Sequence, residues 1–137
     1  PTVVLVDHGS PIPEVTAVRH WLAGRLESLS EGRYQVIEAA MERRPGPEYA
    51  FNGPLLEEAL QQLETEQEGA PVVVAMQFIG PGRHAGQGGD VDRICREAAS
   101  RNQHLEIAMT RLVGEDDALI EILADRTRSK LGSRPQS

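Results

Sequence analysis

The sequence has very little cysteine and no long apolar run. Its 137 residues include a single cysteine, Cys95, so an internal disulfide is excluded and a reducing compartment, the cytoplasm, is expected. No apolar run approaches the ~20 residues that a membrane span needs. The opening segment PTVVLVDHGS has neither the basic start nor the cleavage signal of a secreted protein. We therefore expect neither a membrane anchor nor export.

Positive charge is also scarce. The chain carries 14 basic and 21 acidic residues, which gives a formal net charge of −7, and Lys130 is its only lysine. Because such a chain repels a phosphate backbone, no nucleic-acid partner is expected. A chain of this length most simply forms one domain, which we place at residues 1–131, with residues 132–137 as a frayed tail.

Four apolar segments have the composition of β-strands, and each is followed by a segment with helical spacing. The expected strands are 2–7, 34–41, 71–78 and 105–112. The first and third are almost continuously apolar, as are strands that are covered on both faces of a parallel sheet. These two strands are therefore predicted to lie at the centre of the sheet.

Apolar residues recur at three- and four-residue steps after each strand, as on one face of a helix. The four stripes are Val15, Val18, Leu22, Leu26 and Leu29; Leu56, Leu60 and Leu63; Val91, Ile94, Cys95 and Ala98; and Leu119, Leu123, Thr127 and Leu131. Pro13, Asn52 and Asp90 stand where helix starts or N-caps are expected. The alternation predicts an α/β fold of three layers, with a four-stranded, mainly parallel sheet and helices on both faces.

Three strand ends carry residues that are suited to metal chemistry. Ligands of such sheets bind outside the carboxyl ends of the strands. There this chain has His8 after the first strand, Glu42 after the second, and His84 in a glycine-rich loop after the third. Two imidazoles and a carboxylate suit a borderline divalent ion such as Fe²⁺, Co²⁺ or Ni²⁺. The spacing alone does not establish that the three side chains meet.

Each of these residues also has an ordinary structural explanation. His8 could bond a turn, Glu42 could pair with Arg43 or Arg44, and the glycines around His84 could form a mobile loop. The position at the rim of the sheet favours a functional interpretation of the two histidines. For Glu42 taken alone, an ion pair with arginine is the commoner case.

Four motifs stand in this order along the chain: VVLVDHGS, AAMERRPGP, PVVVAMQFIGPGRH and LIEILADR. Together they resemble the sirohydrochlorin chelatase family, the class II metal chelatases of siroheme and cobalamin synthesis, and the resemblance covers about residues 3–128. It implies a lyase that inserts a divalent metal, Co²⁺ or Fe²⁺, into sirohydrochlorin or a closely related tetrapyrrole, without ATP and without an organic cofactor. It also implies a homodimer, because short members of this length are similar to one half of the longer chelatases.

The resemblance implies roles for individual residues. The functional histidines of the family match His8 and His84, which are expected to be catalytic and to bind metal, and its acidic residue matches Glu42, expected as a third ligand. A macrocycle with many carboxylates is recognised by arginine forks and N–H donors. The expected substrate-binding residues are Ser10, Arg43, Arg44, Gly82 and Arg83.

Two loops depart from the family pattern. The loop HAGQGGDVDRI is longer than usual, and it has Val91 and Asp92 where the family commonly has Ile and Pro after an aspartate. The segment RRPGPEYAFNGP after Glu42 is also longer than the usual connection. The rim of the site is therefore expected to differ in shape from that of other members.

Two other functions stay open at this point. One is a carrier that binds metal or tetrapyrrole without catalysing insertion, which would saturate at one equivalent. The other is nucleotide binding, because GPGRHA at residues 80–85 fits a loose G-x-G-x-x-A pattern, although the next helix is expected only near Asp90. A serine hydrolase is excluded because Ser10 lacks the G-x-S-x-G context. A histidine phosphatase is excluded because Asp7 stands where that chemistry requires arginine.

Overall fold

The computed structural model describes residues 1–66 and 69–132, which form three layers. Its strands are β1 (Thr2–Asp7), β2 (Gln35–Ala40), β3 (Val72–Met76) and β4 (Ile107–Met109). Its α-helices are α1 (Pro13–Leu29), α2 (Leu56–Glu66), α3 (Asp90–Arg101) and α4 (Asp117–Gly132), and two short 3-10 helices are η1 (Pro47–Asn52) and η2 (Val113–Glu115). The predicted three-layer α/β fold is confirmed. The predicted frayed tail, apart from Gly132, lies outside the described residues.

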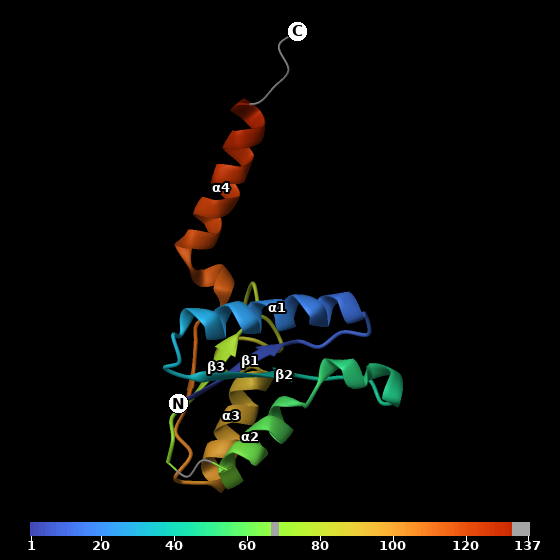
Figure 1. Cartoon of the computed structure of the whole chain (residues 1–137), viewed down its shortest axis with the longest axis vertical. Helices are drawn as coiled ribbons and strands as arrows, with labels where there is room; N and C mark the ends of the chain where they lie inside the picture. Colours follow the sequence, from blue (N-terminus) through green and yellow to red (C-terminus); the bar gives the residue numbers. More distant parts are fainter. Residues whose placement is uncertain (67–68, 133–137) are drawn as a thin grey trace.

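The four strands pair in parallel in the order β2-β1-β3-β4. The two continuously apolar strands, β1 and β3, lie at the centre, as predicted. Val4 and Val6 of β1 belong to the core cluster shared with α2 and α3, while Val3 and Leu5 are buried on the opposite face. Figure 1 shows α1 on one side of the sheet and α2 with α3 on the other. The order of the strands changes direction between β1 and β3, so a ligand crevice is expected at their carboxyl ends.

The edge strand β4 is shorter than the predicted segment 105–112. At its beginning, the N–H of Leu105 closes a turn by donating to the carbonyl of Asn102. At its end, the N–H of Met76 donates to the side-chain hydroxyl oxygen of Thr110 at 2.9 Å instead of to a backbone carbonyl. The regular hydrogen bonding between β3 and β4 therefore stops at both ends of this short strand.

Helix α1 begins at Pro13 as predicted, but its apolar stripe is not the face that packs on the sheet. The buried residues of α1 are Thr16, Arg19 and Ala23. Each follows a stripe residue by one position, a rotation of ~100° around the helix. Val15, Val18 and Leu29 of the stripe are exposed as a result.

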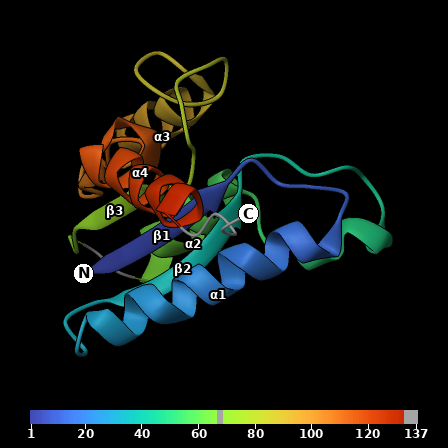
Figure 2. The same cartoon turned by 90° about the horizontal axis from the view of Figure 1, so that it is seen from above.

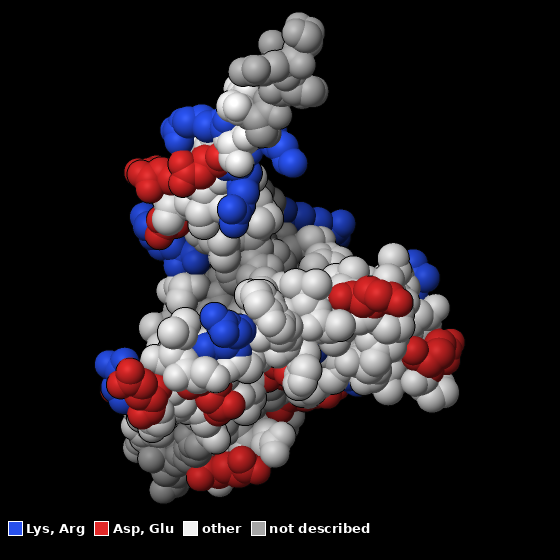
Figure 3. All heavy atoms as spheres, turned by 45° about the horizontal axis from the view of Figure 1, so that its top comes forward, with Lys and Arg blue, Asp and Glu red and all other residues white. Residues whose placement is uncertain are grey.

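Helix α4 projects away from the domain on the side of the sheet that α1 covers (Figures 1 and 2). It has no buried residue, and Ile120, Ile122, Leu123 and Leu131 are more than half exposed. Val73 and Ala75 of β3, which alternate with residues of the core cluster and so face this side of the sheet, are only half-buried. Figure 3 shows basic and acidic side chains together on the projecting helix, and further acidic ones spread over the body. Among the described residues, no helix is long and apolar enough to cross a membrane.

Two expected helix caps are wrong. Asn52 ends η1 and is fully buried, while α2 begins only at Leu56. The N-cap of α3 is Gly89, and Asp90 is the first residue of that helix. Both side chains form hydrogen bonds elsewhere, at the rim of the sheet.

Cys95 lies in the core between α3 and the sheet, where burial raises the pKa of its thiol to about 12. The thiolate is the nucleophile toward disulfide reagents. We therefore expect the folded protein at pH 8 to react with a disulfide reagent such as DTNB at least about tenfold more slowly than the protein unfolded in urea, followed by absorbance. Equal rates in the two states would contradict the buried position.

Candidate functional site

His8 and Glu42 are brought together because β1 and β2 continue to pair beyond their ends. The N–H of Met41 donates to the Asp7 carbonyl at 2.8 Å, and that of Glu42 donates to the His8 carbonyl at 3.1 Å. Gly9, with a φ of +90°, makes this approach possible: a Cβ there would lie 1.9 Å from the Glu42 carbonyl oxygen. Only glycine fits this position without moving the second segment.

A buried arginine supports the same strand ends from below. Arg19 of α1 is 2% exposed, and its Nη1 donates to Asp7 Oδ1 at 2.8 Å and to the Ala39 carbonyl at 3.1 Å. Its Nε donates to Glu38 Oε1 at 3.1 Å, and its Nη2 to the Asn52 carbonyl at 2.6 Å. One guanidinium thus links β1, β2 and η1 immediately beneath His8 and Glu42.

The segment after His8 is also held by the side chain of Asn52. Its Oδ1 accepts from the N–H of Ser10 at 3.0 Å and from the hydroxyl of Thr16 at 3.3 Å. Its Nδ2 donates to the Ser10 carbonyl at 2.9 Å and to the Tyr49 carbonyl at 3.1 Å. The side chain that looked like a helix cap therefore fixes the loop that carries His8.

His84 stands in the loop that joins β3 to α3. The loop closes on itself, since the N–H of Asp90 donates to the Arg83 carbonyl at 3.3 Å and that of Val91 to the His84 carbonyl at 3.2 Å. Gly88 has a φ of +78° and donates its N–H to Asp92 Oδ2 at 2.8 Å. The glycines thus permit a tight return of the chain to α3.

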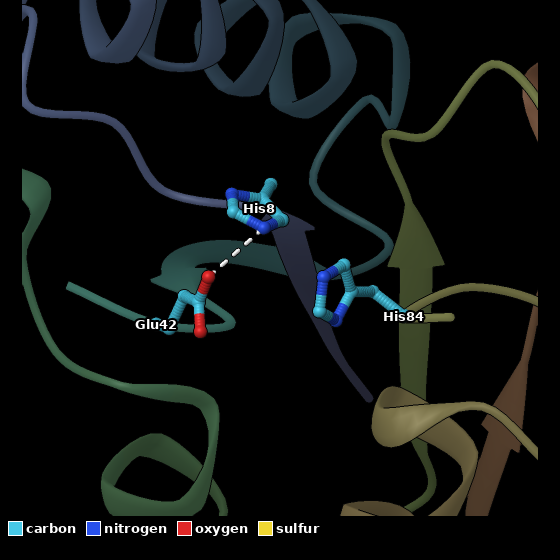
Figure 4. Close-up of side chains that lie close together, drawn as sticks. All are labelled: His8, Glu42 and His84. Atoms are coloured by element: carbon cyan, nitrogen blue, oxygen red, sulfur yellow. Dashed lines mark ion pairs between the residues drawn. The ribbon is translucent and has the colours of Figure 1, made fainter. Parts of the chain in front are cut away.

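The three side chains converge above the carboxyl ends of the central strands (Figure 4). His8 Nε2 lies 3.0 Å from Glu42 Oε1, and the centroids of the His8 and His84 rings lie 4.8 Å apart at an interplanar angle of 65°. One ligand atom from each of His8, Glu42 and His84 lies within 4.8 Å of the others. The meeting of these side chains, which spacing left undecided, is a feature of the fold.

The hydrogen bonds of His8 define the electrostatics of the cluster. Its Nδ1 lies 3.0 Å from the carbonyl oxygen of Gly9, which can only accept, so this nitrogen carries a proton. In the neutral ring, Nε2 then has a lone pair facing the carboxylate of Glu42. Two such groups attract one another only with a cation between them, either a proton or a metal ion. The side chains of His8 and Glu42 are 48% and 59% exposed, so the position is open to a substrate.

His84 has a carboxylate partner of its own. Its Nδ1 lies 2.6 Å from Asp90 Oδ2. This hydrogen bond holds the pKa of Asp90 below its ordinary value of 3.8; desolvation opposes the shift, and the charges of His84, Arg93 and Arg83 add to it. Sequence reasoning treated Asp90 only as a helix cap. Asp90 binds His84 instead of capping α3 because the loop between them is closed, and no local signal in the sequence reveals this closure.

The expected substrate-binding residues fall into two groups. Ser10, Arg43 and Arg44 line an open pocket of about 340 Å³ together with His8 and Glu42. Gly82 and Arg83 are exposed in the next loop, outside the lining of this pocket.

The two arginines after Glu42 differ in how they are held. Arg43 donates to the Gly53 carbonyl and pairs with Glu58 at 3.3 Å. The guanidinium of Arg44 lies 5.8 Å from the centre of the Tyr49 ring, within cation–π range. Arg44 is therefore the more available of the two for an anionic group in the pocket.

The sequence matches a family model for CbiX over residues 2–130. The chain belongs to the CbiX family. This confirms the resemblance to the sirohydrochlorin chelatases over nearly the whole chain. A comparison with curated proteins finds no match.

Membership of the CbiX family gives the type of reaction. CbiX proteins are chelatases that insert a divalent metal ion into a tetrapyrrole, so the metal here is a substrate and not a resident cofactor. The nucleotide alternative loses its support, because α3 begins at Asp90, well beyond the glycine pattern at 80–85, whereas a dinucleotide loop opens directly into its helix.

We expect Arg19→Met to lower the free energy of unfolding by about 3–5 kcal/mol, because it leaves the buried carboxylate of Asp7 without its cationic partner. Urea denaturation would measure the loss. Arg25→Met, an exposed position on the same helix, serves as control and should change stability by less than about 0.5 kcal/mol. A loss below about 1 kcal/mol for Arg19→Met would contradict a supporting role for this arginine.

Proposed function

We propose that the protein inserts Co²⁺ or Fe²⁺ into sirohydrochlorin or a closely related tetrapyrrole, and that His8, Glu42 and His84 hold the metal before its transfer. The observation that carries this proposal is the convergence of their ligand atoms within 4.8 Å. A metal with ligand distances of ~2.1 Å joins atoms up to ~4.2 Å apart, so a small movement brings all three into contact with one ion. The imidazole and carboxylate donors suit Co²⁺, Fe²⁺ and Ni²⁺ alike.

The same residues account for the proton balance of insertion. The two inner N–H protons of the macrocycle leave as the metal enters. A neutral imidazole, with an ordinary pKa of ~6.5, accepts a proton near neutrality. While the metal is bound, the lone pairs of His8 and His84 are occupied; when it passes to the ring, these nitrogens become free to take the two protons. The site then exchanges a doubly charged cation for two protons, and its net charge does not change.

We propose that residues around this cluster bind the carboxylates of the macrocycle. Ser10, Arg43 and Arg44 are supported by their position in the wall of the pocket. Gly82 and Arg83 complete the proposed set from the neighbouring loop. A pocket of about 340 Å³ is near the lower end of the ~300–1,000 Å³ range for small-molecule sites, so it would enclose only part of a wide macrocycle.

We also propose that the protein is a homodimer in which α1 and α4 contribute the interface. Val15 and Val18 of α1 and Ile120 and Leu123 of α4 are large apolar side chains that are 44% to 59% exposed. Large apolar side chains that gather on an exposed face commonly mark protein–protein interaction sites. A second copy of the chain would cover these helices and the half-open outer face of β3.

For the dimer, we expect light scattering after gel filtration to give twice the chain mass of 15.0 kDa. Val18→Glu combined with Leu123→Glu should reduce the mass toward that of a single chain, because two buried charges at an apolar interface are strongly unfavourable. Gly24→Glu, at an exposed position ~120° around α1 from Val18 where a side chain would meet no other atom, is the control. A mass of one chain for the unmodified protein would contradict the dimer.

For the reaction, we expect catalytic amounts of protein to accelerate metal insertion into sirohydrochlorin under anaerobic conditions, followed by absorbance with Co²⁺, Fe²⁺ or Ni²⁺. His8→Ala and His84→Ala should each lower kcat/KM by at least about 10²-fold, because each removes a ligand and a proton acceptor. Their stability should stay close to that of the unmodified protein, since both side chains lie at the rim and not in the core.

The controls for this assay are His20→Ala and His104→Ala, two exposed histidines outside the cluster, which should retain full activity. No acceleration, together with binding of one equivalent of metal or macrocycle, would instead identify a carrier. Full activity of His84→Ala would contradict the proposed ligand set.

A further inference from the structure

Asp90 connects the rim of the site to α3. Its Oδ2 lies 2.6 Å from His84 Nδ1, a distance typical of a charge-assisted hydrogen bond. Its other oxygen, Oδ1, lies 3.7 Å from a guanidinium nitrogen of Arg93. The side chains of His84 and Asp90 are 29% and 34% exposed, so the pair is partly shielded from water.

The backbone holds this pair in register. His84 and Asp90 are six positions apart, but the two hydrogen bonds that join Arg83 to Asp90 and His84 to Val91 close the loop between them. Asp90 is itself the first residue of α3, whose Val91 and Ile94 are buried in the core. The carboxylate is therefore presented to His84 from a rigid element.

The hydrogen bond determines which nitrogen of His84 is available. An ionised carboxylate only accepts, so the proton of the neutral ring resides on Nδ1 and the lone pair on Nε2. Figure 4 shows the His84 ring with one nitrogen turned toward His8. His8 is held in the same way, with Nδ1 on the Gly9 carbonyl. Both rings are thus anchored through Nδ1 and leave Nε2 for the space between them.

We propose that Asp90 is a positioning residue of the site, which fixes the tautomer and orientation of His84 so that Nε2 faces the metal position. A carboxylate that accepts from the remote nitrogen of a ligating histidine also makes the ring a stronger donor, and loss of such a partner typically weakens metal binding ~10–100-fold. The part of this inference that concerns metal rests on the proposed function; the part that concerns the tautomer does not.

The tautomer is tested directly in the metal-free protein. Long-range ¹H–¹⁵N correlation spectra of ¹⁵N-histidine-labelled protein, recorded where the rings are neutral, distinguish protonated from unprotonated ring nitrogens. We expect His84 to carry its proton on Nδ1, to lose this single tautomer in Asp90→Ala, and to keep it in Asp90→Asn, whose amide oxygen still accepts. Asp92→Ala is the matched control, because Asp92 holds the same loop through Gly88 without contacting His84. Loss of the tautomer in Asp92→Ala as well, or its retention in Asp90→Ala, would overturn the proposal.

Titration calorimetry with Co²⁺ alone gives the second measurement. We expect Asp90→Ala to raise the Kd by about 10–100-fold and Asp90→Asn to raise it less. An Asp90→Ala variant with unchanged affinity would overturn the positioning role, provided that the unmodified protein binds Co²⁺. If the unmodified protein bound no metal while the tautomer still depended on Asp90, the proposed function would fail and the assignment of the His84 tautomer would stand.

Discussion

The guanidinium of Arg19 is the interaction on which the geometry of the rim depends. It is buried in the layer between α1 and the sheet, and it bonds the end of β1, the end of β2 and the last residue of η1. A buried charge of this kind is costly unless every partner is in place. Because its partners come from segments far apart in the sequence, the arginine is satisfied only when β1, β2 and η1 have reached their final positions. The same condition places His8 next to Glu42.

Topology then adds the third side chain. The strand order β2-β1-β3-β4 makes β1 and β3 neighbours, and their carboxyl ends flank the point where the order changes direction. His8 follows the first of these strands and His84 the second. The residues come together because parallel strands end at the same edge of the sheet. Asp90 and Asn52 then hold the loops that carry the two histidines. The backbone topology thus brings the three side chains close together, and hydrogen bonds from polar side chains orient them.

The sequence allowed the strands, the helices and the three converging side chains to be predicted, because each depends on local periodicity or on a general rule for parallel sheets. Family motifs reinforced the choice of His8, Glu42 and His84. The orientation of α1 could not be predicted in this way. Its apolar stripe predicts that Val15 and Val18 face the sheet. Instead Arg19 faces the sheet, because it forms ion pairs there with the carboxylates of Asp7 and Glu38.

The N-cap roles predicted for Asn52 and Asp90 are wrong for a related reason. Both residue types are common helix caps, and local sequence cannot distinguish a cap from a side chain that finds a partner across the fold. In this chain each completes a loop of the site, Asn52 by binding the backbone of Ser10 and Asp90 by binding His84. The residues that were misassigned are therefore the ones whose partners lie beyond the reach of local patterns.

A metal site built for transfer has to bind its ion without saturating it. In the proposed site, three protein ligands would leave coordination positions free, and the exposed side chains of His8 and Glu42 would allow a planar ring to approach those positions from solvent. Anchoring of both histidines through Nδ1 would keep their lone pairs directed at the ion while it is bound. When the ion leaves, the same lone pairs would face the ring that has just released its protons. Rigid supporting residues around exposed ligands are thus compatible with the proposed exchange of metal for protons.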